Sequence, residues 1–252
     1  MRPITITGLG LWSPGFADVA SWREGRPDPG VVKPTCRLVD ARLKRGSSRF
    51  ANSLGEVVEQ ACVAGGLDVT SVPTFYGSSL GEIVTMVSLL RMLCDEEGKL
   101  SPNRFKNSVH NAASGLLSIG TENRSFSTAI AGGVRTFETT LIEAWVYLSD
   151  LGGVAVMAVG DDEPPEPLDT LDDHGGLALG FALVAGEAEG PRLHDLRAVP
   201  EVTRHARVPA DLRGNCASAG LELFDAVLSR RAGTVALSPP SGAQLVADLR
   251  MG

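Results

Sequence analysis

The chain has 252 residues and a mass of 26.4 kDa, with 23 Lys and Arg against 30 Asp and Glu, so its formal net charge is −7. This acidic balance argues against a nucleic-acid partner, and 43% hydrophobic with 21% charged residues is the composition of a globular protein rather than a disordered one. The excess acidity is local, because residues 161–173 hold seven acidic side chains and no basic one. We expect this Pro-containing segment to be an exposed loop.

The sequence shows no sign of a membrane segment, a signal peptide or a metal site. No apolar run approaches the roughly 20 residues that a transmembrane helix needs, and the N-terminal MRPITITGLGLWSPGF is typical of a strand and a turn. Cys36, Cys62, Cys94 and Cys216 are far apart, with no CxxC and no His at ligand spacing. They predict reduced core thiols in a cytoplasmic protein.

Strands and helices alternate along the first half of the chain. Ile4, Ile6 and Leu9 mark a first strand, and residues 49–64 and 72–79 follow as a helix and a strand. The next helix begins near residue 81, with a stripe of Ile83, Val87, Leu90 and Cys94, and Gly98 can end it. Asn107 or Ser108 can cap a helix through SVHNAASGLLSIG.

The second half continues the alternation. It contains a strand at 125–131, a helix from Phe137 that ends near Gly152, and buried strands at 154–160 and 176–186. A helix near 216–230 and a strand at 234–238 follow. This order predicts an α/β layer structure around a mostly buried central sheet, in a single domain over residues 1–252 because no linker divides it.

One short motif suggests a serine hydrolase. Gly77-Ser78-Ser79-Leu80-Gly81 matches G-x-S-x-G between a predicted strand and a helix, the setting of a nucleophile elbow. Asp161 with His174, His194 or His205 would follow in the right order. The motif is short, however, and only one clear strand precedes it, so we keep Ser79 as the nucleophile of an alternative hypothesis.

Five segments in order resemble the N-terminal half of β-ketoacyl synthases of the thiolase fold. They are ITITGLGLWSPG, FYGSSLGE, SVHNAASGLLSI, SFSTAIAGGVRTFETTLIEA and DDHGGLALGFALV. The resemblance runs from residue 1 to about 186 and implies αβα layers around a mixed central sheet, with residues 187–252 as a divergent C-terminal extension. SVHNAASG followed by STAIAGG is most similar to short synthase-like proteins of aryl polyene and related pathways, which act as chain length factors.

The resemblance implies that the nucleophile is missing. Synthases read T-A-C at the elbow between strand and helix, and this chain reads Thr128-Ala129-Ile130. Ile130 has no thiol, so it cannot form the acyl thioester of covalent condensation. The resemblance therefore implies a non-catalytic subunit, without a cofactor, that forms a heterodimer with an active β-ketoacyl synthase and receives an acyl carrier protein.

In synthases the nucleophile strand lies at the subunit interface, and its neighbours contribute to the acyl tunnel. The resemblance assigns tunnel or interface roles to nine residues, namely His110, Asn111, Ser114, Phe126, Thr128, Ile130, Gly132, Gly133 and Phe137. Bulky apolar side chains among them would limit the length of the acyl chain. His110 can equally be a structural histidine, and the Gly132-Gly133 pair can serve close packing after a tight elbow. No P-loop or complete GxGxxG fingerprint is present, which argues against a nucleotide.

The chain also contains a basic cluster, although its net charge is negative. Arg37, Arg42, Lys44, Arg45 and Arg49 face a single Asp40 in CRLVDARLKRGSSR. They could attract an acidic acyl carrier protein, or simply form a solvated face. A non-catalytic scaffold or carrier-binding homodimer remains a further alternative to the heterodimer.

Overall fold

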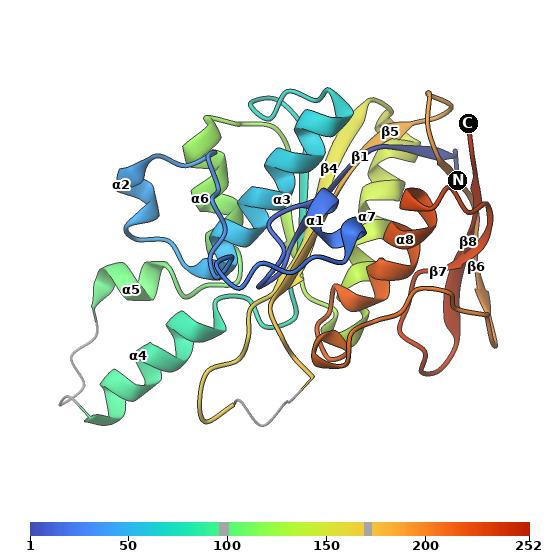
Figure 1. Ribbon diagram of the computed structural model, residues 1–252. Helices are drawn as coiled ribbons and strands as arrows, with labels where there is room; N and C mark the ends of the chain where they lie inside the picture. Colours follow the sequence, from blue (N-terminus) through green and yellow to red (C-terminus); the bar gives the residue numbers. More distant parts are fainter. Residues whose placement is uncertain (96–100, 169–172) are drawn as a thin grey trace.

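The computed structural model describes residues 1–95, 101–168 and 173–252, in which eight strands form one mixed sheet of order β3-β2-β4-β5-β1-β6-β8-β7 (Figure 1). The strands are β1 Ile4–Trp12, β2 Thr74–Gly77, β3 Ser127–Ile130, β4 Val154–Asp161, β5 Leu177–Ala185, β6 Arg192–Val199, β7 Gly233–Ala236 and β8 Gln244–Arg250. The α-helices are α1 Val19–Glu24, α2 Ala41–Lys44, α3 Arg49–Gly65, α4 Ile83–Asp95, α5 Pro102–Lys106, α6 Ala112–Thr121, α7 Thr136–Leu151 and α8 Leu221–Leu228. Short 3-10 turns are η1 Gly133–Arg135, η2 Ala210–Leu212 and η3 Ser218–Gly220.

Helices cover both faces of the sheet, which confirms the predicted αβα layers. Alternate residues of β4 divide between two cores: Met157 and Val159 pack with α7 and α8, whereas Val156 and Ala158 pack with α3 and α6. This period of two is the signature of a strand buried on both faces. The continuous apolar run of residues 154–160 therefore supplies both cores at once.

The long helix α3 lies directly on glycines of the two central strands. A Cβ at Gly10 on β1 or at Gly180 on β5 would come within 2.3 Å of the Val57 carbonyl oxygen. The side-chain-free backbone therefore lets α3 approach the sheet closely. This contact explains why glycines interrupt both apolar strands.

Three strands are parallel, and this arrangement creates the candidate site. β2 pairs in parallel with β3 on one side and with β4 on the other. The carboxyl ends of these strands therefore meet at one edge of the sheet. By contrast, β5 runs antiparallel to both β4 and β1.

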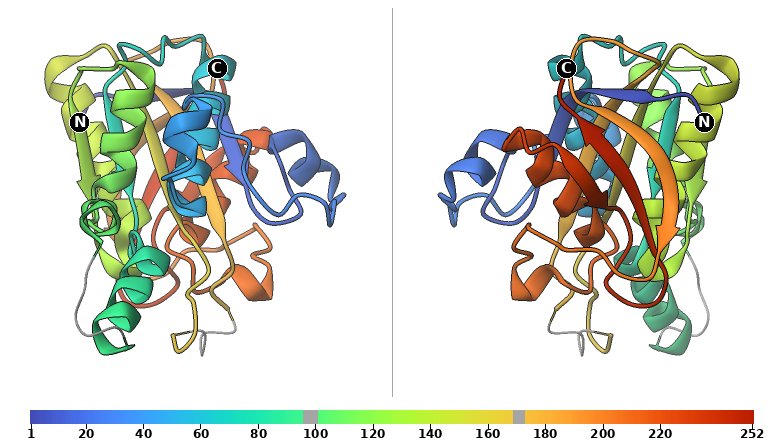
Figure 2. Two further views of the ribbon diagram at one scale, coloured as in Figure 1. Left: turned by 90° about the vertical axis from the view of Figure 1, so that its left-hand side faces the viewer. Right: turned by 90° about the vertical axis from the view of Figure 1, so that its right-hand side faces the viewer.

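The C-terminal residues extend the same sheet. β6 pairs with the start of β1, and β8 and β7 follow it to the far edge, turned toward the viewer in the right-hand view of Figure 2. The strands β6 and β8 were missed by the sequence analysis. Only four of the eight residues of β6 are apolar, they do not alternate regularly, and the register shifts between His194 and Arg197, so its pattern is weak.

Two helix predictions need correction. The helix predicted from Asn107 or Ser108 begins only at Ala112, after the separate helix α5 and a turn that contains His110. In α4 the predicted buried stripe is wrong at its end, since Leu90 and Cys94 are exposed while Leu89 is buried. Its proposed stop at Gly98 lies outside the described residues. α4 and α5 project from the body of the protein, so they bury only part of their apolar surface (Figure 1).

Candidate functional site

The carboxyl ends of β3, β2 and β4 bring three separate segments together. Gly77 aligns with Ile130 on one side and with Val159 on the other. The Ser78 amide extends the ladder by donating to the Ile130 carbonyl oxygen at 3.0 Å. Asp161, the last residue of β4, faces the Ser78-Ser79 turn across this edge.

Asp161 is the centre of a buried hydrogen-bond network. Its carboxylate accepts hydrogen bonds from the Ser78 and Ser79 hydroxyls and from the amides of Ser79 and Leu80, both amides at 3.0 Å. Asp161 is 2% exposed and Asp162 is 5% exposed, so the prediction that residues 161–173 form an exposed loop is wrong at its start. The burial of these two carboxylates is tolerated because hydrogen-bond donors surround Asp161 and because Arg49 forms an ion pair with Asp162.

The network keeps Asp161 ionised. Burial alone would raise the pKa of this carboxyl, but the contact with His174 and the hydrogen bonds from Ser78 and Leu80 outweigh burial and hold the pKa below its ordinary value of 3.8. His174 Nε2 lies 3.6 Å from Oδ2 of Asp161, which is an electrostatic contact longer than a hydrogen bond. Asp161 is therefore a structural anion and a weak proton acceptor.

The side chains at this edge do not form the Ser-His-Asp triad of a serine hydrolase. Ser79 Oγ donates to Asp161 at 2.8 Å, whereas a triad places the imidazole between serine and carboxylate. Ser79 also lacks the positive φ that marks a strained elbow, since the positive-φ non-glycine residues in the described part are Cys36, Glu122, Asp195 and Arg230. His194 lies on β6 and His205 is exposed, its amide bonded to Glu222.

Cys216 belongs to this cluster and was missed by sequence reasoning. It is 2% exposed and lies beside Asp161 and Thr136. Burial raises the pKa of the Cys216 thiol well above its usual range, and the Asp161 charge adds to the effect. The thiol is therefore protonated and shielded. No local motif could have shown this contact, because the two residues come from distant parts of the chain.

The predicted elbow residues lie together at the end of β3. Thr128 and Ile130 are partly exposed, and Gly132 and Gly133 link the strand to α7. Gly133 has φ +58°, and a Cβ at Gly132 would come within 2.9 Å of Thr139 Oγ1. Both positions therefore suit glycine, as a tight elbow requires.

The two predicted phenylalanines lie in different environments. Phe126 is 46% exposed at the start of β3 and stacks on Tyr147 with ring centroids 5.1 Å apart. Phe137 is fully buried and packs edge-to-face on Phe181, 5.8 Å between centroids. Only Phe126 thus presents its ring at the surface.

The residues around the start of α6 adjoin the same edge of the sheet. His110 Nε2 lies 2.9 Å from the Ser78 carbonyl oxygen, which ties its turn to the end of β2. Asn111 is the N-cap residue of α6 without a side-chain cap bond, and it is exposed. The Ser114 hydroxyl donates to the Asn111 carbonyl at 2.9 Å.

Four of the five basic residues form an accessible group, and one does not. Arg37, Arg42 and Arg45 are exposed, and Lys44 on α2 donates to the Thr35 carbonyl. Arg49 instead bonds the buried Asp162, with its Nε 2.8 Å from Oδ1. Its charge is therefore largely neutralised within the fold.

Within residues 1–95, 101–168 and 173–252 no group of three His, Cys, Asp or Glu side chains is arranged to hold a metal ion. No helix in these ranges is long and apolar enough to span a membrane. The candidate site is thus a strand-end cluster of polar groups beside an apolar elbow.

A mixed sheet between two helical layers, with three parallel strands ending at one polar edge, is the architecture of thiolase-like synthase domains. The family model of the β-ketoacyl synthase N-terminal domain matches residues 20–238, and the chain belongs to this family. A comparison with curated protein sequences gave no match.

Solved structures share this fold at low sequence identity. A chain of the ketosynthase ApeO in complex with its chain length factor ApeC, from Xenorhabdus doucetiae, is 17% identical, with a TM-score of 0.74 over 98% of this chain and 99% of that chain. The complex AntDE:AntF, a type II polyketide acyl carrier protein with its ketosynthase, gives a TM-score of 0.75 at 12% identity, with both chains fully covered. A β-ketoacyl synthase from Burkholderia phymatum gives a TM-score of 0.60 at 13% identity, covering 92% of this chain and 72% of that chain.

Proposed function

We propose that this chain is a non-catalytic subunit of the chain-length-factor type, which pairs with an active β-ketoacyl synthase in aryl polyene, polyketide or fatty-acid-type biosynthesis in the cytoplasm. The observation that carries the proposal is that β3 is an edge strand of the sheet in the described residues and ends at Ile130. We align Ile130 with the catalytic cysteine of synthases. The similarity of fold to chains of complexes between ketosynthases and a chain length factor or a carrier protein supports it.

The chemistry of the cluster supports a non-catalytic role. Ile130 offers no nucleophile, and the neighbouring thiol of Cys216 is buried with a raised pKa. Ser79 is bonded to an ionised carboxylate that is a weak base. The described groups at this edge therefore stabilise the strand ends and do not activate an acyl transfer.

The free edge of β3 supports pairing with a partner chain. The carbonyls of Phe126 and Ile130 accept from β2, so by the alternation along a strand the backbone groups of Ser127 and Ala129 face outward. An unpaired edge of this kind is a template for another chain. Exposed apolar side chains occur at the start of β3, in the adjoining helices and in the following turn, namely Phe126, Ile119 of α6, Val134 of η1 and Val146 of α7.

In the proposed role, this chain shapes the acyl pocket of the partner synthase sterically and takes no part in the reaction. Ile130 and Thr128 would form the wall that faces the partner's acyl chain, with Phe126 at its border and Gly132 and Gly133 allowing a close approach. His110, Asn111 and Ser114 would border the same space. Phe137, which is buried behind the elbow, would support this wall from inside the core.

The accessible basic residues would attract the acyl carrier protein. Arg37, Arg42, Lys44 and Arg45 are proposed for this role, whereas Arg49 would contribute little because Asp162 neutralises it. We further propose that residues 187–252 belong to the same domain, because β6 hydrogen-bonds to β1 within one sheet.

Turnover measurements on the purified chain test the absence of catalysis. Incubated alone with acyl and malonyl carrier protein, it should neither retain a covalent acyl group in mass spectrometry nor release a condensed product. Adding a synthase with an intact T-A-C elbow should give product. Condensation by this chain alone would contradict the proposal, and a homodimer that does not bind the synthase would favour the scaffold alternative.

A further inference from the structure

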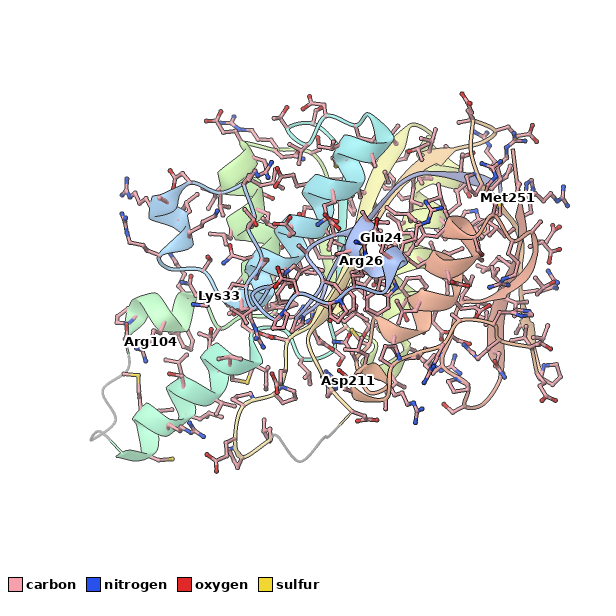
Figure 3. All side chains as sticks on the ribbon, in the orientation of Figure 1. Glu24, Arg26, Lys33, Arg104, Asp211 and Met251 are labelled. Carbon is pink, nitrogen blue, oxygen red and sulfur yellow. The ribbon has the colours of Figure 1, made fainter. Side chains whose placement is uncertain are left out.

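A cavity of about 310 Å³ lies between the turn that leads into α7 and the C-terminal segment, and the proposed function uses none of its lining residues except Val134. Its apolar wall comes from Val134, Val208, Ala219 and Pro239, and its charged groups are Arg204 and Arg213. Figure 3 labels Asp211, which belongs to the η2 turn immediately before Arg213. The volume is that of a small-molecule site.

The lining carries positive charge only. Arg204 and Arg213 are the ionisable residues that line the cavity, and no acidic residue of the described chain joins them. Such a lining favours a negatively charged ligand.

Arg204 is a half-buried cation that forms no ion pair with a carboxylate of the described residues. Its Nη2 donates to the Ser238 carbonyl and to Gln244 Oε1, both of which are neutral. Among the residues that the structure describes, no carboxylate lies within 4.0 Å of its guanidinium, and no bond from its Nε or Nη1 is formed. A charge removed from water is normally paired, so this guanidinium has donors left for an anion.

The surrounding acids are engaged elsewhere or lie outside the lining. Glu222 accepts from the amides of His205 and Ala206 and pairs with Arg231 at 2.8 Å. Asp173 is exposed and lies behind Gly214. The Gly214 amide donates to the Asp173 carbonyl oxygen at 2.8 Å. Burial lowers the pKa of Arg204 and the charge of Glu222 partly opposes this shift, but neither Glu222 nor Asp173 forms an ion pair with a cavity arginine.

We propose that this cavity binds a small amphiphilic carboxylate, whose charged end is held by Arg204 and Arg213 and whose apolar end lies against Val134, Val208 and Pro239. An arginine fork matches the two oxygens of a carboxylate, and the mainly aliphatic wall suits a short hydrocarbon chain. The site shares Val134 with the proposed partner surface beside β3, but its two arginines belong to the C-terminal segment, so ligand binding can be measured without a synthase partner.

Isothermal titration calorimetry of the purified full chain with hexanoate tests this site. We expect saturable binding of one hexanoate per chain, and binding of hexan-1-ol and inorganic phosphate that is weaker by about tenfold or more, because each lacks one half of the interaction. Phosphate that binds as tightly as hexanoate, or hexanol that does so, would overturn the assignment of a carboxylate.

Two variants locate the binding, and a third is their control. Arg213→Gln should weaken the affinity for hexanoate by about tenfold, because it removes a charge-assisted hydrogen bond to the carboxylate. The affinity for hexanol should not change. Val134→Trp should abolish binding by filling the cavity, while Val63→Trp, at another exposed valine on α3, should leave binding unchanged. Circular dichroism confirms that each variant is folded. Hexanoate affinity that is unchanged in both Arg213→Gln and Val134→Trp would refute the proposal.

Discussion

The hydroxyl of Ser79 donates directly to the carboxylate of Asp161 at 2.8 Å, across the ends of β2 and β4. This bond places the serine of the G-x-S-x-G segment in a structural role. With the amides of Ser79 and Leu80 it fixes the turn after β2, which in turn holds the end of β3 through the bond between Ser78 and Ile130.

Asp161→Asn should destabilise the protein. The asparagine side chain has one acceptor oxygen fewer than aspartate. At least one buried donor therefore loses its acceptor, which lowers the free energy of unfolding by about 2 kcal/mol. Asp150→Asn on the exposed end of α7 is the matched control and should change stability little. Urea unfolding of both variants measures the difference, and equal stabilities would contradict the structural role of Asp161.

The pH dependence of that difference has a defined sign. Because the pKa of Asp161 is held below 3.8 in the folded protein, its contribution is complete above about pH 5 and is lost as the pH falls through and below 3.8. The stability gap between wild type and Asp161→Asn should therefore narrow in acid. A gap that widens below pH 4 would contradict the direction of the shift.

Glu82 should show the opposite behaviour. Burial raises the pKa of this carboxyl, although Ser48 and Thr85 donate to it. A raised folded pKa means that its charge reduces stability as the pH rises through the unfolded value of 4.5. Glu82→Gln should be more stable than wild type at pH 7 and similar at pH 3. A variant that is less stable at pH 7 would refute this assignment.

Native cysteine labelling should modify one thiol in four. Cys94 is exposed on α4, which corrects the prediction of a core thiol there. Cys36 and Cys62 are buried, and burial raises their pKa to about 11 and about 12. Iodoacetamide at pH 7.5 followed by peptide mass spectrometry should find Cys94 alkylated and the other three intact. Rapid modification of Cys216 would contradict its shielded position.

The size of residue 130 should control product length in the complex with a synthase. Ile130→Ala enlarges the proposed wall and should shift products to longer chains, whereas Ile130→Trp should shorten them. Val63→Trp on the remote surface of α3 is the control for added bulk. Chromatography of the products measures the distribution. Identical products from all variants would show that Ile130 does not line the acyl pocket.

The strands could be predicted from the sequence wherever the hydrophobic pattern was strong. The runs at 154–160 and 176–186 are long and apolar, and both are buried strands of the sheet. By contrast, β6 carries exposed charges and a register shift, so neither its existence nor its place beside β1 was evident. The burial of Asp161 could not be predicted, because its compensating donors lie some 80 residues away in the turn after β2.

The most direct test of the central claim is the mass of the complex formed with a synthase that has an intact elbow. Light scattering after size-exclusion chromatography should show a one-to-one heterodimer for the wild-type chain. Ala129→Pro removes an outward donor of β3 while leaving the bonds to β2, and should abolish pairing. Thr234→Pro alters β7 at the opposite edge of the sheet and should still pair. A heterodimer that persists in Ala129→Pro, or a wild-type chain that never joins the synthase, would contradict the account.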